Sequence, residues 1–63
     1  MAKGNSFTYE QAATAKYLVH TMHLYQHKAA ALLGCNQGRI SEAVNGKVHP
    51  DAPTANLLNV EVH

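Results

Sequence analysis

Gly34 stands between two short segments that both favour a helix, and it limits how those segments can be joined. Residues 26–33 include three consecutive alanines and two leucines, which have high helix propensity. A glycine directly after such a segment is typical of a helix that ends in a left-handed backbone conformation. Asn36 is a good N-cap for a second helix over residues 37–45, and no proline interrupts either segment. The sequence therefore predicts two helices joined by a tight turn.

The two predicted helices carry apolar residues that can form a shared core. Ala30 supplies a small side chain where two steeply crossing helices approach each other. We expect the other core positions of this pair to be Ala29, Leu33, Cys35, Ile40, Ala43 and Val44. Ile40 in particular should be buried between the helices. Taken alone, this apolar pattern also fits a generic three-helix bundle.

A further helix is predicted upstream, over residues 9–22. Thr8 and Gln11 have the spacing of a capping box, and Glu10 in the first turn favours the positive end of the helix dipole. Apolar residues then recur at spacings of three and four, as expected for one buried stripe: Ala12, Ala15, Leu18, Val19 and Met22. The predicted fold class is all-α, a small three-helix domain.

The two ends of the chain differ in pattern from this helical part. Residues 1–7 are predicted to be a flexible leader, and residues 8–49 to be the helical domain. Two prolines then interrupt the periodicity, so residues 50–63 are predicted to form an extended C-terminal tail. Thr54 can cap one short fourth helical turn there. The tail is either an oligomerisation arm or a segment that hangs free.

The length of the chain points to a partner. Sixty-three residues form one domain at most, and a domain this small buries only about 60% of the surface that its unfolded chain exposes. Cys35 is the single cysteine, so no intrachain disulfide can add stability, and we expect it in the core. A second copy is the simplest remaining source of burial, and we therefore expect a homodimer. No signal peptide or membrane span is evident, so we expect a cytoplasmic, nucleoid-associated protein.

The net charge of +1 is too small to indicate nucleic acid by itself, but it is unevenly distributed. Residues 1–49 hold all five basic residues and two acidic ones, whereas residues 50–63 hold two acidic residues and no lysine or arginine. A mildly basic body with an acidic tail fits DNA binding. It equally fits many ordinary small domains.

The segment QHKAAALLGCNQGRISEAVNGK, residues 26–47, resembles the helix-turn-helix of lambdoid phage repressors and Cro, and of the wider repressor-like family. Beside the small residue, the glycine and the apolar set, the resemblance rests on Gln26 and Gln37, which open the two helices. Residues 45–47, Asn-Gly-Lys, resemble the loop that follows the recognition helix in these proteins. The resemblance implies a sequence-specific DNA-binding protein, a small bacterial or phage transcriptional regulator that reads the major groove with residues 37–45.

This resemblance also implies which residues contact double-stranded DNA. The residues implied at base edges are Gln37, Gly38, Ser41 and Glu42, and those implied at phosphates are Gln26, His27, Lys28, Arg39, Asn45 and Lys47. The amide of Gln37 can bridge N6 and N7 of an adenine. Glu42 can accept from N4 of a cytosine or can simply keep the helix soluble, and Arg39 can instead pair with it. Lys28 and Lys47 can be merely solvated.

Other chemistry is less well supported by the sequence. His20, His23 and His27 are close together, but they lack a cysteine or acidic partner, so we expect surface histidines and no metal. No acid, base and nucleophile occur together, so we expect neither an enzyme nor a cofactor or small-molecule ligand. Two alternative functions remain: a structural DNA adaptor of a recombination or packaging complex, and a helix-turn-helix protein-interaction module that does not bind DNA.

Overall fold

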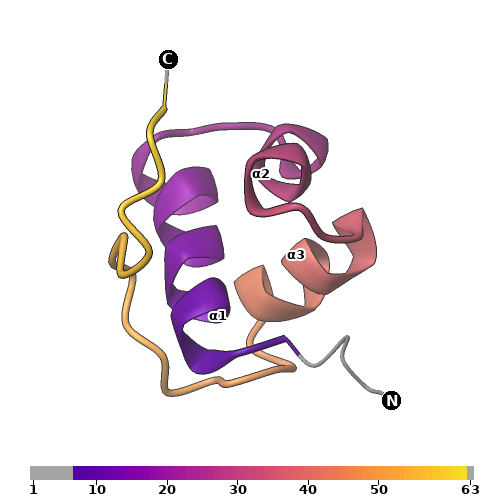
Figure 1. The fold of residues 1–63 in the computed structure, drawn as a ribbon. Helices are drawn as coiled ribbons and strands as arrows, with labels where there is room; N and C mark the ends of the chain where they lie inside the picture. The colour runs from indigo at the N-terminus through magenta and orange to yellow at the C-terminus, as the bar shows by residue number, and fades with distance from the viewer. Residues whose placement is uncertain (1–6, 63) are drawn as a thin grey trace.

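The computed structural model describes residues 7–62, and this part of the chain is all-α. Three α-helices of eight residues each are present: α1 (Tyr9–Lys16), α2 (Gln26–Leu33) and α3 (Gln37–Val44). α1 continues directly into a π-helical segment, η1 (Tyr17–Thr21). Figure 1 shows α1 with this extension on one side of the molecule and α2 and α3 on the other. No strand occurs among the residues described, so the predicted all-α three-helix class is confirmed.

α1 begins with the predicted capping box. The backbone N–H of Gln11 donates to Thr8 Oγ1 at 3.1 Å, and the backbone N–H of Thr8 donates to Gln11 Oε1 at 2.9 Å. Glu10 lies in the first turn, where a carboxylate interacts favourably with the helix dipole. Two N–H groups at the start of the helix are thereby satisfied without any contact to the rest of the chain.

The last turn of this helix differs from a regular α-helix. The N–H of Met22 donates to Tyr17 O at 3.1 Å, five residues back, which is the π-helical spacing. His23 then takes a left-handed backbone conformation with φ +60°, and Leu24 N donates to Leu18 O at 3.0 Å. The helix therefore ends close to the predicted residue, but a histidine occupies the left-handed position that a glycine usually takes.

Gly34 ends α2 in the way the sequence predicts. Its φ is +68°, and the next N–H, of Cys35, donates to Ala30 O at 3.0 Å, as in the Schellman motif. Asn36 then starts α3, because its Oδ1 accepts from Gly38 N at 2.7 Å. Three residues thus join the two helices, a connection as short as the sequence predicts.

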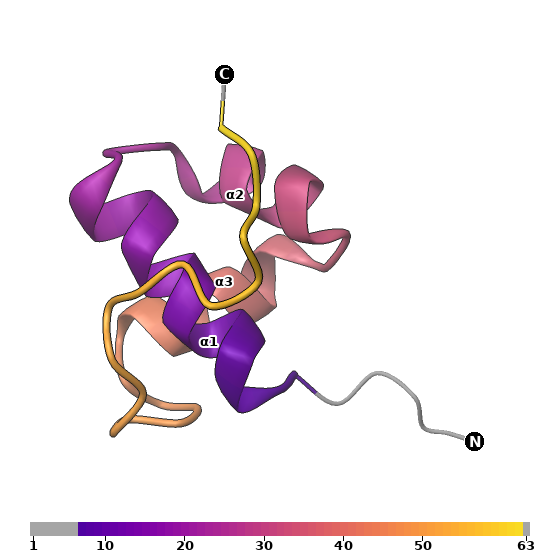
Figure 2. The same ribbon diagram turned by 60° about the vertical axis from the view of Figure 1, so that its left-hand side comes forward.

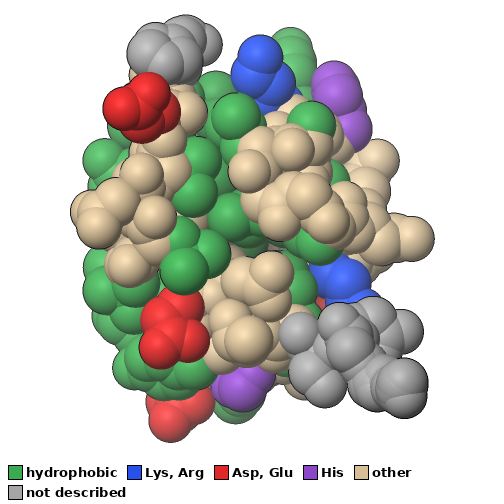
Figure 3. Space-filling view, viewed as in Figure 1, with side chains coloured by type: hydrophobic (Ala, Val, Ile, Leu, Met, Phe, Trp, Pro, Cys, Tyr) green, Lys and Arg blue, Asp and Glu red, His purple; other side chains and the backbone are tan. Residues whose placement is uncertain are grey.

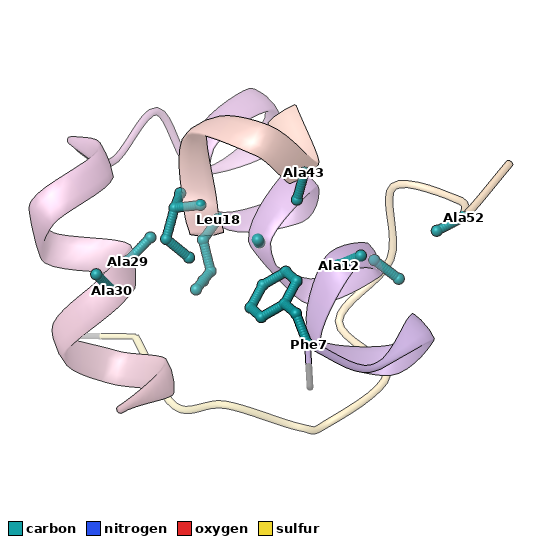
Figure 4. Packing of buried hydrophobic residues seen from close by; sticks show 10 residues of the cluster. Phe7, Ala12, Leu18, Ala29, Ala30, Ala43 and Ala52 are labelled. Carbon is teal, nitrogen blue, oxygen red and sulfur yellow. The ribbon is translucent and has the colours of Figure 1, made fainter. Parts of the chain in front are cut away.

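The core is built mainly from small side chains. Its buried apolar residues are Phe7, Ala12, Ala13, Ala15, Leu18, Ala29, Ala30, Ile40, Ala43 and Ala52. Leu18 and Ile40 are fully buried, and Figure 4 shows the Ala29 side chain pointing from α2 toward Leu18. The predicted burial of Ile40 is confirmed. Seven of these ten residues are alanines, so the helices can approach closely and α3 packs against both α1 and α2.

Three of the predicted core residues lie at the edge of this cluster. Leu33, Cys35 and Val44 are half-buried and pack against it. Desolvation by burial raises the pKa of the Cys35 thiol above its usual value, so its reactive thiolate form is disfavoured. This agrees with a packing role for Cys35.

The core begins earlier than the sequence suggests. Phe7, which the sequence assigns to the flexible leader, is only 8% exposed, and its ring packs within the cluster in Figure 4. Its carbonyl oxygen lies 2.9 Å from His49 Nε2, and the His49 ring meets the Tyr9 ring edge-on, with centroids 6.1 Å apart. The expectation for Phe7 is therefore wrong, because the core cluster takes up its ring and His49, in the loop after α3, donates to its carbonyl oxygen. Residues 1–6 lie outside the described residues.

The C-terminal segment packs along α1 and does not extend away from the domain. Figures 1 and 2 show it crossing α1 on the side away from α2. Within it, Ala52 is buried, Ala55 N donates to Ala13 O at 3.3 Å, and Leu58 N donates to Thr14 Oγ1 at 3.3 Å. An extended, freely hanging tail is therefore not what the structure contains.

The short fourth helical turn is also absent from residues 50–62. Thr54 lies in a bend and caps no helix. Two backbone donors of this segment, Ala55 N and Leu58 N, are instead used by α1. The Asn56 side chain makes two 2.9 Å hydrogen bonds with the backbone of Val60. Local propensity is overridden here by contacts with a distant helix.

Lys16 anchors the start of this segment. Its side chain is buried at 8% exposure, and Nζ donates to the carbonyl oxygens of Ala52 at 2.8 Å and of His49 and Pro50 at 3.3 Å each. An ammonium group has three donors, and here all three are used. Lys16 therefore joins α1 to the loop after α3, and its charge is not available to a ligand.

We predict that Gly34→Val lowers the free energy of unfolding by more than about 1 kcal/mol, because a β-branched residue is strained at positive φ. No heavy atom would lie within 4 Å of a new Cβ, so the cost arises from the backbone and not from a steric clash. Gly34→Asn is the matched control and should cost less, since asparagine tolerates this conformation. Denaturant unfolding followed by circular dichroism measures both, and an unaffected valine variant would contradict the left-handed turn.

We further predict that Lys16→Met destabilises the protein by about 1–3 kcal/mol. The methionine keeps most of the apolar stem but leaves three carbonyl groups without their donor. Lys28→Met, at an exposed position of α2, is the control and should stay within about 0.5 kcal/mol of wild type. Equal stabilities of the two variants would show that the Lys16 contacts do not hold the C-terminal segment.

Candidate nucleic-acid interface

α3 has one buried face and one accessible face. Ile40 and Ala43 point into the core and are fully buried. Every predicted DNA-contact residue of α3 and its C-cap is exposed or partly exposed: Gln37, Gly38, Arg39, Ser41, Glu42 and Asn45. The fold therefore leaves the polar side of this helix accessible along its whole length.

Gln37 is the most accessible candidate for base recognition. It is the first residue of α3, it is exposed, and within residues 7–62 its side chain makes no hydrogen bond. Its amide thus offers one donor group and one acceptor, which match the N7 acceptor and N6 donor of adenine. The other helix-opening glutamine, Gln26, is partly exposed and makes no hydrogen bond to Gln37.

Gly38 has a structural explanation that needs no ligand. A Cβ at this position would lie 3.2 Å from Asn36 Oδ1, the atom that accepts from Gly38 N at 2.7 Å. A side chain would therefore crowd the cap of α3. The close approach of DNA is not required to account for this glycine.

Two hydrogen bonds between side chains run along the accessible face of α3. Arg39 Nη1 donates to Glu42 Oε1 at 3.2 Å, forming an i,i+3 ion pair. Asn45 Nδ2 donates to Ser41 Oγ at 3.3 Å. Of the alternatives that the sequence left open for Arg39, the structure contains the pairing with Glu42.

The start of α2 carries an exposed aromatic pair. The Tyr25 ring is 78% exposed and stacks on the ring of His27, with centroids 5.7 Å apart and an angle of 8° between the planes. No side chain caps the N-terminus of α2, and Lys28 in its first turn is exposed. Uncapped N–H groups at a helix start favour an anion such as a phosphate. Because Tyr25 is largely exposed, it is not the half-buried packing residue that a tyrosine directly before a helix more often is.

Fewer basic residues are exposed than the sequence suggests. Lys16 is buried, which leaves Lys28, Arg39 and Lys47 as the exposed lysine and arginine side chains of residues 7–62. Lys47 follows Gly46, and its N–H donates to Glu42 O at 2.8 Å, so the loop turns tightly after α3. On the face drawn in Figure 3, blue side chains lie on the side of α2 and α3, and most of the red ones lie along α1 and the C-terminal segment. The charge of this face is therefore polarised, although Glu42 on α3 offsets Arg39.

The structural role of Lys16 could not be found from the sequence. A lysine at the end of an amphipathic helix is normally solvated, and its acceptors are carbonyl groups more than thirty residues away. Thr14 is a similar case, because a fully buried threonine in a helix is unusual until Leu58 is seen to donate to it. Nearly every residue has a backbone carbonyl and an N–H group, so the sequence does not indicate which of them will pair with Lys16 or Thr14.

Metal and membrane chemistry receive no support from the described residues. Among them no three His, Cys, Asp or Glu side chains gather closely enough to hold a metal ion. None of the helices in residues 7–62 has the length and apolar character needed to cross a bilayer. Comparisons of the chain with protein-family models, curated proteins and solved structures gave no match.

Proposed function

We propose that the protein is a sequence-specific DNA-binding protein, a small bacterial or phage transcriptional regulator that reads the major groove with α3. The observation that carries this proposal is the accessible polar face of α3, which starts with an unengaged Gln37 and is joined to α2 by a three-residue turn. In a helix-turn-helix the N-terminal part of the second helix meets the base edges. The proposal includes a homodimer located in the cytoplasm at the nucleoid.

Base contacts and phosphate contacts have different roles in this proposal. Gln37 recognises adenine, and Ser41 and Glu42 lie further along the same accessible face. Gly38 contributes only by leaving room for the Asn36 side chain that caps α3. The phosphate contacts come from Gln26, His27, Lys28, Arg39, Asn45 and Lys47. The phosphate contacts set affinity and orientation, and the few base contacts set specificity.

The surface charge limits how strongly salt can affect binding. Residues 7–62 hold three exposed lysine or arginine side chains, so this part of the chain can neutralise at most about three phosphates. Its contribution to the slope of log K against log salt should therefore be about −3 or shallower for each bound chain. A much steeper slope would require cations outside the described residues.

A protein-interaction module is the second candidate function. Residues 7–62 contain four acidic residues and four lysines or arginines, one of which is buried. Leu57 and Leu58 on the C-terminal segment are each 43% exposed, as expected of a surface that contacts protein. Weak, salt-independent binding to DNA would favour this function. A structural adaptor would instead assemble into a ring or filament larger than a dimer.

Substitutions of Gln37 and Lys47 test the DNA-binding proposal. Gln37→Ala should weaken binding to the preferred site by about 1–3 kcal/mol while leaving affinity for random duplex nearly unchanged. Lys47→Ala should weaken both alike and flatten the salt slope by about one charge. The preferred site comes from selection on a random DNA pool, and fluorescence anisotropy at several salt concentrations provides the affinities.

Thr21→Ala is the control, because Thr21 is exposed at the end of η1, outside α2 and α3. It should bind both duplexes as wild type does. If Gln37→Ala behaves in the same way on every duplex, α3 does not read bases. If wild type binds no duplex even at low salt, the interaction module becomes the preferred function.

A further inference from the structure

The charged residues of α3 neutralise each other on its accessible face. Arg39 and Glu42 are the only charged residues of this helix, and their side chains are 45% and 42% exposed. Their Nη1 and Oε1 atoms are 3.2 Å apart. α3 therefore approaches DNA as a neutral helix, although DNA is a polyanion.

Arg39 is the sole side-chain partner of Glu42 among the described residues. The amide of Asn45, three residues further along, donates to Ser41 Oγ and not to Glu42. The N–H of Lys47 bonds to the backbone oxygen of Glu42 and leaves its carboxylate unaffected. Whatever removes Arg39 from Glu42 therefore leaves an unpaired carboxylate on the accessible face.

We propose that Glu42 determines the specificity of α3 mainly by disfavouring wrong DNA sequences. Its ion pair with Arg39 decides when the carboxylate is free to do so. In the unbound protein Glu42 holds the Arg39 guanidinium, so that Arg39 contributes little attraction to arbitrary DNA. On DNA its carboxylate is tolerated only where the base edge that it faces presents an amino group. This inference rests on the proposed function, because it assigns a role within the same α3 surface.

The Arg39–Glu42 ion pair can be exchanged for contacts with DNA. Exposed i,i+3 pairs are weak, so breaking the pair itself costs little. A phosphate or a guanine can therefore take Arg39 where a base amino group compensates the freed carboxylate, whereas on other sequences the carboxylate would be left without a partner and the pair stays closed. The freed carboxylate then loses water as the groove closes around it.

Every base pair has one amino group in the major groove, but its position differs between the four pairs. Cytosine N4 or adenine N6 can donate to the carboxylate when that amino group lies at the base edge that Glu42 faces, whereas guanine O6 and N7 or thymine O4 at that edge are acceptors and cannot. Wrong sequences are thus rejected by an uncompensated charge.

Glu42→Gln tests this role, because glutamine keeps the shape and removes the charge. We expect this variant to bind random duplex about 3–10-fold more tightly, with a salt slope steeper by about 0.9 because Arg39 becomes available for a phosphate. Its ratio of specific to random affinity should fall at least about fivefold. In an Arg39→Ala background, Glu42→Gln should no longer steepen the slope.

Glu10→Gln is the matched control. It removes the same charge from an exposed position in the first turn of α1, outside α2 and α3, and should change random-duplex affinity less than about twofold. Equal effects of the two glutamine variants, with an unchanged specificity ratio, would overturn the role of Glu42 and leave DNA binding intact. Absence of duplex binding by wild type would overturn the proposed function and this inference together. Unchanged melting temperatures verify that each variant is folded.

Discussion

The left-handed backbone at Gly34 determines how α2 and α3 are placed, and most of the structure follows from that placement. With Gly34 at positive φ, the N–H of Cys35 bonds back to Ala30, and the chain turns within three residues. Ile40 is then directed into the core, while the first turn of α3 stays accessible. A residue that resists this conformation would disturb the packing and the candidate interface together.

A core made mostly of alanine brings the helices close but buries little apolar surface. Leu18 and Ile40 are the only apolar residues larger than alanine that are fully buried in the described part of the chain. The segments that flank the helices therefore matter more than their irregular structure suggests. Phe7 adds the one aromatic ring among the buried residues of the core, and Lys16 holds the loop that carries Ala52. Leu57 and Leu58 of the C-terminal segment stay partly exposed and add little to this small core.

The electrostatics of the surface suit selective binding better than strong binding. Burial of Lys16 and pairing of Arg39 leave only Lys28 and Lys47 as exposed, unpaired lysine or arginine side chains within residues 7–62. Long-range attraction to a polyanion is correspondingly weak. In the proposed function, discrimination must then come from short-range contacts of α3. Its accessible face carries amide, hydroxyl and carboxylate groups, which are suited to that task.

The sequence by itself determined the helices, their caps and the turn between α2 and α3. Helix propensity, the Thr8–Gln11 capping box and the preference of Gly34 for positive φ are local, so they can be recognised without the fold. The accessibility of Gln37 followed from the periodicity that buries Ile40. Only the tertiary structure decided the roles of Phe7 and Lys16 and the course of residues 50–62. Their partners are backbone and side-chain groups of segments far along the chain, and such contacts leave no periodic or compositional pattern in the sequence.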